Sequence, residues 1–373
     1  MNNGICKNCI MDTSDVEIIF DNQGVCNHCH RYYEELPKRV FTGEVAEKKL
    51  ADIVKRIQLK GEGRAYDCII GVSGGVDSTY VAYLTKKLGI RALAVHFDNG
   101  WNSELAVSNI EKVLKKLDID LYTYVIDWEE FKDLQLSFLK ASTPDGEIPT
   151  DHAINALLFR EASNRGIKYI INGMNFATES MAVKMWAYGH SDWKYIKAVQ
   201  RKFGSKSLRK YPYYTFMNLF YWTFIKRIKV VSILNYIDYN KDEVMKIIED
   251  KLDWVYYGGK HYESVYTRFF QGYILPVKFR IDKRKGHLSD LIRSGQISRL
   301  EAITELKKVG YDEEMRMMDT PFVLKKLGLE ESEFNKIMNE NPKSFLDYPN
   351  NYKIIVRIKK FTNVLRLKGL YSK

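Results

Sequence analysis

The chain has 373 residues, of which 45% are hydrophobic, and a formal net charge of +11 at pH 7. Single cores stop growing at roughly 250–300 residues, so we expect two or more structural units. No basic segment followed by an apolar stretch opens the sequence, which argues against a secretory signal, and we expect a cytoplasmic protein. The basic excess favours anionic partners, among them nucleotides, sugar nucleotides, RNA and anionic membrane surfaces.

Four cysteines near the N-terminus form two close pairs. Two residues separate Cys6 from Cys9, the same spacing separates Cys26 from Cys29, and sixteen residues lie between the pairs. Such pairs can place four thiolates tetrahedrally around one zinc ion, and four thiolates leave no open position of the kind that catalytic zinc keeps. We therefore predict a structural Zn²⁺ site, with four reduced cysteines and no metal as the alternative.

The cysteines are predicted to belong to an N-terminal zinc-binding unit over residues 1–40. Gly4 and Gly24 precede the two pairs and can supply tight turns. Residues 16–20 are interpreted as the strand of a hairpin between the pairs. In residues 45–59 the apolar side chains recur at helical spacing, with charges on the opposite face, so we expect a linking helix.

Short β-rich runs alternate with amphipathic helical patterns in the next part of the chain, predicted as one domain over residues 41–190. The expected strands are 67–72, 91–97, 121–126 and 168–172, and the expected helices are 78–88, 104–117, 129–139 and 151–164. This alternation predicts right-handed βαβ units and a parallel sheet covered on both faces, an α/β fold.

The most informative motif is Gly-Val-Ser-Gly-Gly-Val-Asp-Ser-Thr at residues 71–79, between the first predicted strand and its helix. Backbone N–H groups at a helix N-terminus form a nest that suits a phosphate or pyrophosphate. The lysine-containing phosphate loop cannot be read across these residues. The motif resembles the PP-loop of the ATP pyrophosphatase superfamily, whose members split ATP into AMP and pyrophosphate. The residues expected to bind ATP are Ser73, Gly74, Gly75, Asp77 and Ser78.

Polar residues also follow the second and fourth predicted strands. Ligands of parallel sheets bind at the carboxyl ends of the strands, so Asp98, Asn172 and Gly173 are expected beside the loop. Resemblance to the PP-loop superfamily implies that adenine lies against Val95 and Phe97. For Asp98 the alternative is a plain turn residue, because Asp-Asn-Gly is a strong turn signal.

Two carboxylates are candidates for holding Mg²⁺. Asp77 lies in the loop and Glu179 follows the fourth predicted strand. Carboxylate oxygens suit Mg²⁺, which would bridge phosphate oxygens and neutralise the departing pyrophosphate. The alternative for Glu179 is a carboxylate stabilised by the positive end of a helix.

An aromatic stretch at residues 211–225 is flanked by Lys226, Arg227 and Lys229. It is too short and too interrupted to span a bilayer. It fits a buried helix of a mainly helical C-terminal region (residues 191–373), an interfacial helix on an anionic membrane, or a docking face for a partner protein. The buried helix is the usual outcome and is the prediction.

A second polar segment spans residues 261–289. Basic side chains between residues 278 and 285 could reach over the strand ends to grip pyrophosphate or an acidic sugar nucleotide, with a solvated charged turn as the alternative. The expected catalytic residues there are Lys278, Arg280, Lys283 and Arg284. The expected substrate-binding residues are His261, Glu263, Arg268 and Gln271.

Several motifs together resemble the N-acetyl sugar amidotransferase family of bacterial surface-polysaccharide enzymes, over nearly the whole chain. They are the cysteine pairs, the Ser73 to Ser78 loop, His-Phe-Asp-Asn-Gly-Trp-Asn at 96–102, Leu-Asn-Tyr-Ile-Asp-Tyr-Asn at 234–240, Tyr-Gly-Gly-Lys-His-Tyr-Glu-Ser at 257–264 and Ile-Asp-Lys-Arg-Lys-Gly-His-Leu-Ser at 281–289. The loop is superfamily-wide, whereas the last two segments narrow the resemblance to this family.

The resemblance implies a conversion of an amide to an amidine. The acetamido oxygen of a nucleotide-linked N-acetyl sugar would attack the α-phosphate of ATP, pyrophosphate would leave, and ammonia would then displace AMP to give an acetamidino sugar. The resemblance also implies ATP, Mg²⁺ and Zn²⁺ as cofactors. Ammonia would come from a separate glutamine amidotransferase similar to the histidine-pathway glutaminase and cyclase.

Two other classes of protein share some of these features. A tRNA-modifying PP-loop thiolase would also carry cysteine pairs and basic charge, but such enzymes commonly use reactive cysteines, and only Cys68, predicted to lie in the core, remains outside the pairs. A non-catalytic zinc-containing docking protein is the other alternative. We expect no nucleic-acid partner and no membrane-spanning segment, with peripheral membrane contact left open.

Overall fold

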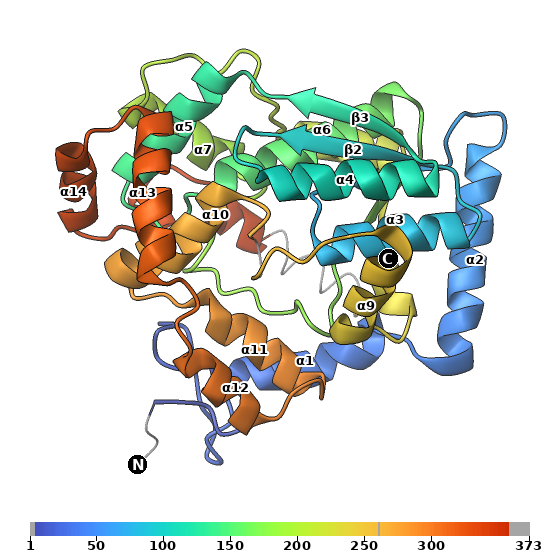
Figure 1. Cartoon of the computed structure of the whole chain (residues 1–373), viewed down its shortest axis with the longest axis horizontal. Helices are drawn as coiled ribbons and strands as arrows, with labels where there is room; N and C mark the ends of the chain where they lie inside the picture. Colours follow the sequence, from blue (N-terminus) through green and yellow to red (C-terminus); the bar gives the residue numbers. More distant parts are fainter. Residues whose placement is uncertain (1–3, 260–261, 358–373) are drawn as a thin grey trace.

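The computed structural model describes residues 4–259 and 262–357 and is built around a parallel five-stranded sheet (Figure 1). The strands lie in the order β3-β2-β1-β4-β5, and every neighbouring pair is parallel. Their bounds are β1 (Cys68–Gly71), β2 (Ala92–Asp98), β3 (Asp120–Val125), β4 (Tyr169–Asn172) and β5 (Lys229–Ser232). The predicted α/β class with a parallel sheet is confirmed.

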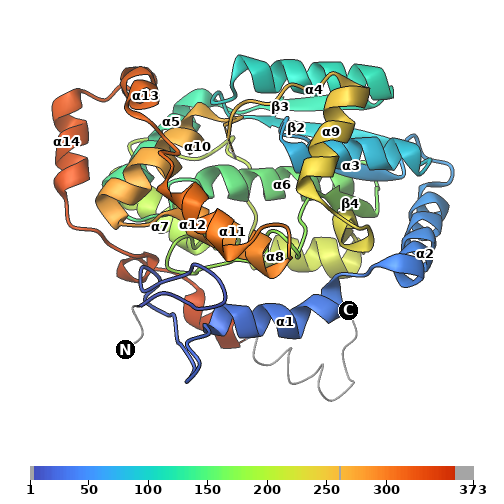
Figure 2. The ribbon, with the colours of Figure 1, turned by 60° about the horizontal axis from the view of Figure 1, so that its bottom comes forward.

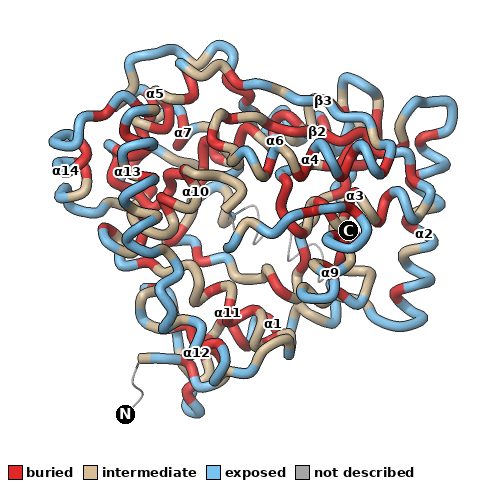
Figure 3. The backbone as a smooth tube through the Cα atoms, viewed as in Figure 1, coloured by how far each residue is buried: buried red, intermediate tan, exposed pale blue. Residues whose placement is uncertain are grey.

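Side chains of the central strand alternate between two hydrophobic cores. Ile70 belongs to the core with α3 (Val76–Lys87), α4 (Glu104–Leu117) and α9 (Lys241–Leu252). Ile69 belongs to the other core, with α5 (Trp128–Lys140), α6 (Ile148–Asn164) and α7 (Trp193–Phe203). This period-2 alternation lets one strand bury apolar side chains on both faces. Figure 3 shows the buried positions concentrated along these elements.

The predicted helices of this domain are all present. The helix expected at 104–117 is α4 with the same bounds, because Ser103 caps its N-terminus by accepting from the Ala106 N–H and Asp118 ends it in the left-handed region. The linking helix is α2 (Gly43–Gly61). The helix expected from residue 151 starts earlier, at Ile148, because Pro149 lies in its first turn, where no N–H is needed.

The region after residue 190 is mostly helical but supplies one strand to the sheet. β5 pairs with β4, with Ile170 opposite Val230, so the sheet extends beyond the predicted domain boundary. The remaining helices are α10 (Val265–Phe269), the π-helix η3 (Phe270–Phe279), α11 (Lys283–Arg293), α12 (Arg299–Lys307), α13 (Glu313–Leu327) and α14 (Glu331–Asn339). The same region contains the short turns η2 (Ile233–Tyr236) and η4 (Phe345–Asp347).

The N-terminal unit packs against α11 and α12 (Figure 2). Its helix is α1 (Asn27–Arg39), and both predicted turn glycines have positive φ, +69° at Gly4 and +82° at Gly24. The prediction of a strand at 16–20 was wrong: only Phe20 makes a bridge there, with Cys26. Asp15 and Asp12 instead accept hydrogen bonds from nearby backbone N–H groups, which favours turns over an extended strand.

The aromatic stretch at 211–225 contains helix α8 (Phe216–Phe220) and the π-helical turn η1 (Tyr221–Ile225). The prediction of a buried helix was wrong for most of it. Tyr211, Tyr214 and Trp222 are buried, whereas Met217 is 74% and Ile225 is 62% exposed. The sequence pattern was ambiguous because aromatic side chains surround this helix on every side, so periodicity does not identify its inner face.

Candidate nucleotide-binding site

The loop between β1 and α3 has a conformation that only glycine can adopt at one position. Gly74 has φ of +81°, and an added Cβ atom would lie 2.7 Å from the carbonyl oxygen of Ala106. Positive φ is strained for residues with a side chain, and backbone this close cannot give way cheaply. Gly74 therefore allows the loop to pass directly over the first turn of α4.

Hydrogen bonds within the loop hold its shape. The Ser78 hydroxyl accepts from the Ser73 N–H at 3.3 Å and donates to the Gly75 carbonyl at 3.1 Å. The Ser73 hydroxyl accepts from the Gly75 N–H at 3.3 Å. α3 begins at Val76, so the loop ends at a helix N-terminus, where backbone N–H groups and the helix dipole favour an anion. This arrangement fits a phosphate group.

The end of β4 approaches the same helix N-terminus. A Cβ atom at Gly173 would lie 3.1 Å from the backbone carbon of Asp77, so glycine permits this approach. The side chain of Asn172 accepts from the Met174 N–H at 3.3 Å and stabilises the turn that follows β4. The predicted ATP-binding residues of the first and fourth strands therefore lie together at the carboxyl edge of the sheet.

The two predicted magnesium ligands share one neighbour. The Tyr239 hydroxyl donates a hydrogen bond to the Asp77 carboxylate. Burial raises the pKa of Tyr239 above its ordinary value, and the negative charges of Asp77 and Glu179 raise it further. Two carboxylates here fit the usual Mg²⁺ site of one or two protein carboxylates, with phosphate oxygens and waters as the other ligands. The magnesium role itself stays a prediction.

A distant segment of the chain closes over the loop. Asn102 pairs with Ser264, the Ser103 N–H donates to the Glu263 carbonyl at 2.8 Å, and Val265 donates back to Trp101 at 2.9 Å. A Cβ atom at Gly75 would lie 3.6 Å from the Glu263 carboxylate. The predicted substrate residue Glu263 is therefore beside the predicted phosphate loop, although the two are far apart in sequence.

Tyr257 and Trp254 complete this covering segment. The ideal Cβ position of Gly75 is 3.4 Å from the Tyr257 hydroxyl, and the Trp254 indole N–H donates to the Gly74 carbonyl at 2.8 Å. Burial raises the pKa of Tyr257, and the neighbouring Glu263 carboxylate raises it further, so its hydroxyl keeps its proton. Neither residue was among the sequence predictions. Tyr257 begins one of the motifs noted above, which was the available signal.

The residues expected to hold adenine lie at the end of β2. The side chains of Val95 and Phe97 are buried in the core on the α5 face, and Phe97 stacks on Tyr124 with ring centroids 6.1 Å apart. Their side chains are therefore not available to a nucleotide, and the Val95 carbonyl already accepts from the Val72 N–H at 3.0 Å. Asp98 accepts from the Gly100 N–H at 2.8 Å, as its turn interpretation requires. The adenine contact stays a prediction.

Two of the predicted catalytic basic residues are bound elsewhere. The Lys278 ammonium donates to the carbonyls of Ile337 and Glu340, so it anchors α14. Arg284 forms an ion pair with Asp282 at 2.8 Å and donates to the Lys308 carbonyl at 2.7 Å. Arg280 ends η3 in the left-handed region, at φ of +57°. These contacts give Lys278 and Arg284 structural roles that their sequence positions do not indicate.

The other predicted residues of the segment 261–289 contact two different carboxylates. Arg268 forms a two-pronged ion pair with Asp319, at 2.8 and 2.7 Å, which fastens α10 to α13. Gln271 and Lys283 both donate to Glu147, at 2.9 and 2.7 Å. Glu147 immediately precedes α6 and was not predicted. His261 lies outside the described residues.

A polar cluster surrounds the start of α6, beside Glu147. His190 forms an ion pair with Asp151 at 3.3 Å, and the Asn99 side chain donates to Thr150 at 3.1 Å. Burial raises the pKa of Asp145 to about 6, although the Tyr195 hydroxyl donates to its carboxylate at 2.7 Å. Because Asn99 follows β2, this cluster adjoins the same edge of the sheet as the loop. It is the part of the candidate site that could contact a second substrate besides the nucleotide.

The four paired cysteines meet at one point. Their sulfur atoms all lie within 4.8 Å of one another and all four residues are buried. The Cys9 to Cys26 and Cys26 to Cys29 separations are both 3.7 Å. A tetrahedral zinc ion with bonds of about 2.3 Å would hold sulfurs at very similar separations. The residues present fit the predicted closed zinc site, and metal binding stays a prediction.

The N-terminal unit is connected to the loop after β4 through residues of α11. Asp290 on α11 accepts from Ser180 and from the Met181 N–H at 2.8 Å, and it also pairs with buried Arg293. The Arg293 guanidinium lies over the ring of Tyr32 on α1, 5.2 Å from its centroid. The cysteine cluster and the segment that carries Glu179 are thus joined by a continuous set of packed residues.

Two family models match parts of the chain. The model described as "LPS biosynthesis protein WbpG-like, C-terminal domain" matches residues 263–362, and the model described as "Queuosine biosynthesis protein QueC" matches residues 67–185. The first match contains the polar segment that follows Glu263, and the second contains the loop and β1 to β4. Together they support the PP-loop superfamily and a link to lipopolysaccharide biosynthesis.

Individual proteins are similar to this chain at low sequence identity, between 15% and 33%. An uncharacterized protein of Methanocaldococcus jannaschii is 25% identical over 315 residues, covering 81% of this chain and 93% of that protein. The tRNA(Ile)-lysidine synthase of Chlamydia pneumoniae is 33% identical over 70 residues, covering 18% of this chain and 22% of the synthase. Among solved structures, NMN synthetase from Francisella tularensis (15% identity, TM-score 0.30) covers 62% of this chain and 93% of its own. NH3-dependent NAD synthetase from Campylobacter jejuni (15% identity, TM-score 0.30) covers 56% and 83%.

Proposed function

We propose that this protein is an ATP-dependent amidotransferase that converts the N-acetyl group of a nucleotide-linked sugar to an acetamidino group. The observation that carries the proposal is the loop at 73–78, which sits at a helix N-terminus with Asp77 and Glu179 around Tyr239. The match of residues 263–362 to a lipopolysaccharide-biosynthesis family supports a sugar as the acceptor.

The proposed reaction needs no nucleophilic side chain. The acetamido oxygen attacks the α-phosphorus of ATP, the bond to the β-phosphate oxygen breaks, and pyrophosphate leaves with that electron pair. Ammonia then adds to the activated carbon, AMP departs with the former carbonyl oxygen, and loss of a proton leaves the amidine. The protein contributes orientation and stabilisation of developing negative charge.

The described residues support particular tasks. The loop N–H groups and α3 would hold the β- and γ-phosphates, and Asp77 with Glu179 would hold Mg²⁺, which supplies positive charge to the leaving pyrophosphate. Glu263 and Tyr257 cover the loop and would exclude water, which competes with ammonia. The polar cluster at Glu147 and Lys283 would contact the sugar acceptor.

The proposal includes a partner, because ammonia must be supplied. We propose a separate glutamine amidotransferase for that role and a cytoplasmic setting, where nucleotide-linked sugars and ATP are substrates. The Zn²⁺ site would be structural, since its four sulfurs leave no open ligand position.

A tRNA-modifying thiolase is disfavoured by Cys68. This cysteine lies inside β1 and is fully buried, and burial raises the pKa of its thiol above the ordinary value. A buried neutral thiol is a poor nucleophile. The other described cysteines all belong to the four-sulfur cluster, so the chain offers no reactive thiol among them.

The test is incubation of the purified protein with ATP, Mg²⁺, an ammonium salt and a panel of UDP- and CMP-linked N-acetyl sugars. We expect AMP formation that depends on one sugar, together with a product in which mass spectrometry shows an imino group in place of the carbonyl oxygen. AMP release stimulated by tRNA, with every sugar unchanged, would contradict the amidine proposal. Binding of ATP without AMP formation under any condition would favour the docking protein.

A further inference from the structure

The helix made of α8 and η1 turns its apolar side away from the core. Trp222 anchors it by stacking on Phe159, with ring centroids 5.4 Å apart. Helical spacing places residues four apart on one side, and that side here is exposed. The exposed side chains are Phe216, Met217, Phe220, Tyr221, Phe224 and Ile225. An outward apolar row of this kind is unusual for a surface helix and indicates an interaction site.

Uncompensated positive charge lies beside this helix. Lys168 donates to the Lys226 carbonyl at 2.9 Å. Burial lowers the pKa of Lys168, and the surrounding charges of Arg64, Lys226, Arg227 and Lys60 lower it further. Among the described residues, no carboxylate forms an ion pair with Lys226 or Arg227. Like charges gathered without counter-charges attract an anionic surface.

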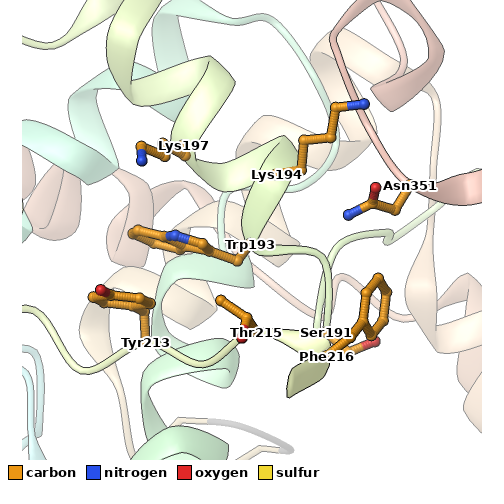
Figure 4. Close-up of a pocket in the computed structure, with 8 residues that line it drawn as sticks. All are labelled: Ser191, Trp193, Lys194, Lys197, Tyr213, Thr215, Phe216 and Asn351. Carbon is orange, nitrogen blue, oxygen red and sulfur yellow. The ribbon is translucent and has the colours of Figure 1, made fainter. Parts of the chain in front are cut away.

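A hollow of about 430 Å³ continues the same surface (Figure 4). The rings of Trp193 and Tyr213 stack in it with centroids 4.2 Å apart, and Phe216 lines it as well as beginning the exposed row. Lys194 and Lys197 project from α7 along its rim. Trp and Tyr side chains prefer the boundary between lipid headgroups and hydrocarbon, and lysines there meet phosphate groups.

The sequence around these features is strongly one-sided in charge. Between residues 191 and 229 the only acidic residue is Asp192. Asp192 is buried and caps α7, so it faces inward. No described helix of this chain is both long and apolar enough to cross a bilayer. A contact of these described helices with a bilayer would therefore be made at the bilayer surface.

We propose that this basic aromatic face, made of α8, η1 and the Trp193 hollow, docks on the surface of an anionic phospholipid bilayer. The exposed row of α8 and η1 enters the headgroup region, and the lysines and Arg227 contact lipid phosphates. The combination of an apolar row with flanking cations favours a bilayer over a purely electrostatic partner such as RNA, because such a partner would not use the apolar row. The proposal does not depend on the enzymatic activity proposed above.

The test is co-sedimentation of the full chain with vesicles of phosphatidylglycerol and phosphatidylcholine, and with vesicles of phosphatidylcholine alone. We expect binding to the anionic vesicles only, weakening as salt rises. Phe220→Ser with Phe224→Ser should lower the partition coefficient at least about tenfold, because apolar area no longer enters the interface. Lys194→Gln with Lys197→Gln should lower it about 25-fold, at about fivefold per charge.

Matched controls lie elsewhere on the surface. Met317→Ser with Met318→Ser removes two exposed apolar side chains from α13, and Lys112→Gln with Lys115→Gln removes two exposed charges from α4. Both control pairs should leave vesicle binding within about twofold of wild type, apart from the small loss of overall charge. Unchanged circular dichroism would show that each variant is folded.

Three results would overturn the proposal. The first is equal binding to neutral and anionic vesicles. The second is an equal loss of vesicle binding in the Phe220→Ser, Phe224→Ser variant and in the Met317→Ser, Met318→Ser control. The third is a protein that self-associates in sedimentation velocity without lipid and becomes monomeric on Phe220→Ser with Phe224→Ser, which would assign the face to a second copy.

Discussion

The hydroxyl of Tyr32 donates a hydrogen bond of 3.0 Å to the carbonyl of Ala177, two residues before Glu179. Tyr32 lies on α1, the helix that also carries Cys29 of the cluster, and its ring stacks on Phe176 with centroids 5.7 Å apart. The unit that we expect to bind zinc therefore supports the segment that carries a candidate magnesium ligand. This connection makes the N-terminal unit part of the framework that positions the candidate site.

Tyr32→Phe should weaken that support without unfolding the protein. The ring contacts remain, but the Ala177 carbonyl loses its donor, which costs about 1 kcal/mol in free energy of unfolding. We expect a raised KM for ATP with unchanged zinc content. The control is Tyr213→Phe, which removes a hydroxyl from an exposed tyrosine outside the N-terminal unit and should change neither quantity. An unaltered KM in Tyr32→Phe would contradict the support role.

Cys9→Ser should release the metal and destabilise the N-terminal unit. A serine hydroxyl does not replace a zinc thiolate, and structural zinc contributes directly to folding. The measurement is metal content by atomic emission together with the thermal midpoint. Cys68→Ser is the control, because it alters a buried cysteine of β1 that is outside the cluster and should keep one zinc per chain. Full zinc content in Cys9→Ser would defeat the assignment.

Gly74→Ala should abolish nucleotide binding. The new methyl group would lie 2.7 Å from the Ala106 carbonyl oxygen, in addition to the strain of positive φ. Gly63→Ala is the control, because Gly63 has φ of +72° but no atom within 4 Å of its ideal Cβ position. The control should lose about 1–2 kcal/mol of stability from backbone strain alone. Calorimetric titration with ATP should show binding in Gly63→Ala and none in Gly74→Ala.

Asp77→Asn should prevent AMP formation and leave the fold intact. The amide keeps an oxygen that can accept from Tyr239, but it removes the negative charge expected to hold Mg²⁺. We expect the turnover number to fall at least about a hundredfold, with a thermal midpoint close to wild type. Retained turnover would remove Asp77 from the magnesium site. Tyr239→Phe, which leaves the carboxylate in place, should retain measurable activity.

His152 should make the protein sensitive to acid. Burial lowers the pKa of His152 to about 4, and its ring nitrogens contact the His190 carbonyl at 3.0 Å and the Tyr214 N–H at 3.2 Å. The unfolded chain takes up a proton near pH 6.5 and the folded chain does not until near pH 4. Acidification through that window therefore favours unfolding, by up to about 3 kcal/mol.

The measurement is urea unfolding of wild type and His152→Gln between pH 4.5 and 7.5. Asp145 contributes with the opposite sign, since its pKa is raised to about 6 and folding takes up its proton as the pH falls. The two proteins are therefore compared at each pH, so that this contribution cancels. We expect the variant to lose less stability on acidification than wild type. Parallel pH profiles would show that His152 is not the group responsible.

Local patterns determined most of the central domain from the sequence alone. The strand and helix periods and the loop at 73–78 depend on residues close in the chain, and the structure has these elements near the predicted positions. The cysteine spacing likewise predicted one four-sulfur cluster. Each of these features is set by contacts within a few residues or by a repeated short motif, which a linear reading can detect.

Only the tertiary structure decided which polar side chains were left for the site. Lys278, Arg268 and Arg284 have the same charges as residues that bind phosphate, yet their partners on α14, α13 and α12 hold them in place. Conversely, Tyr239 and Glu147 joined the candidate site through contacts with residues far along the chain. A charged side chain binds the nearest partner in space, and that distance exists only after the helices have packed. The same reason explains why the sequence identified the aromatic stretch but only packing around Trp222 showed which side faces outward.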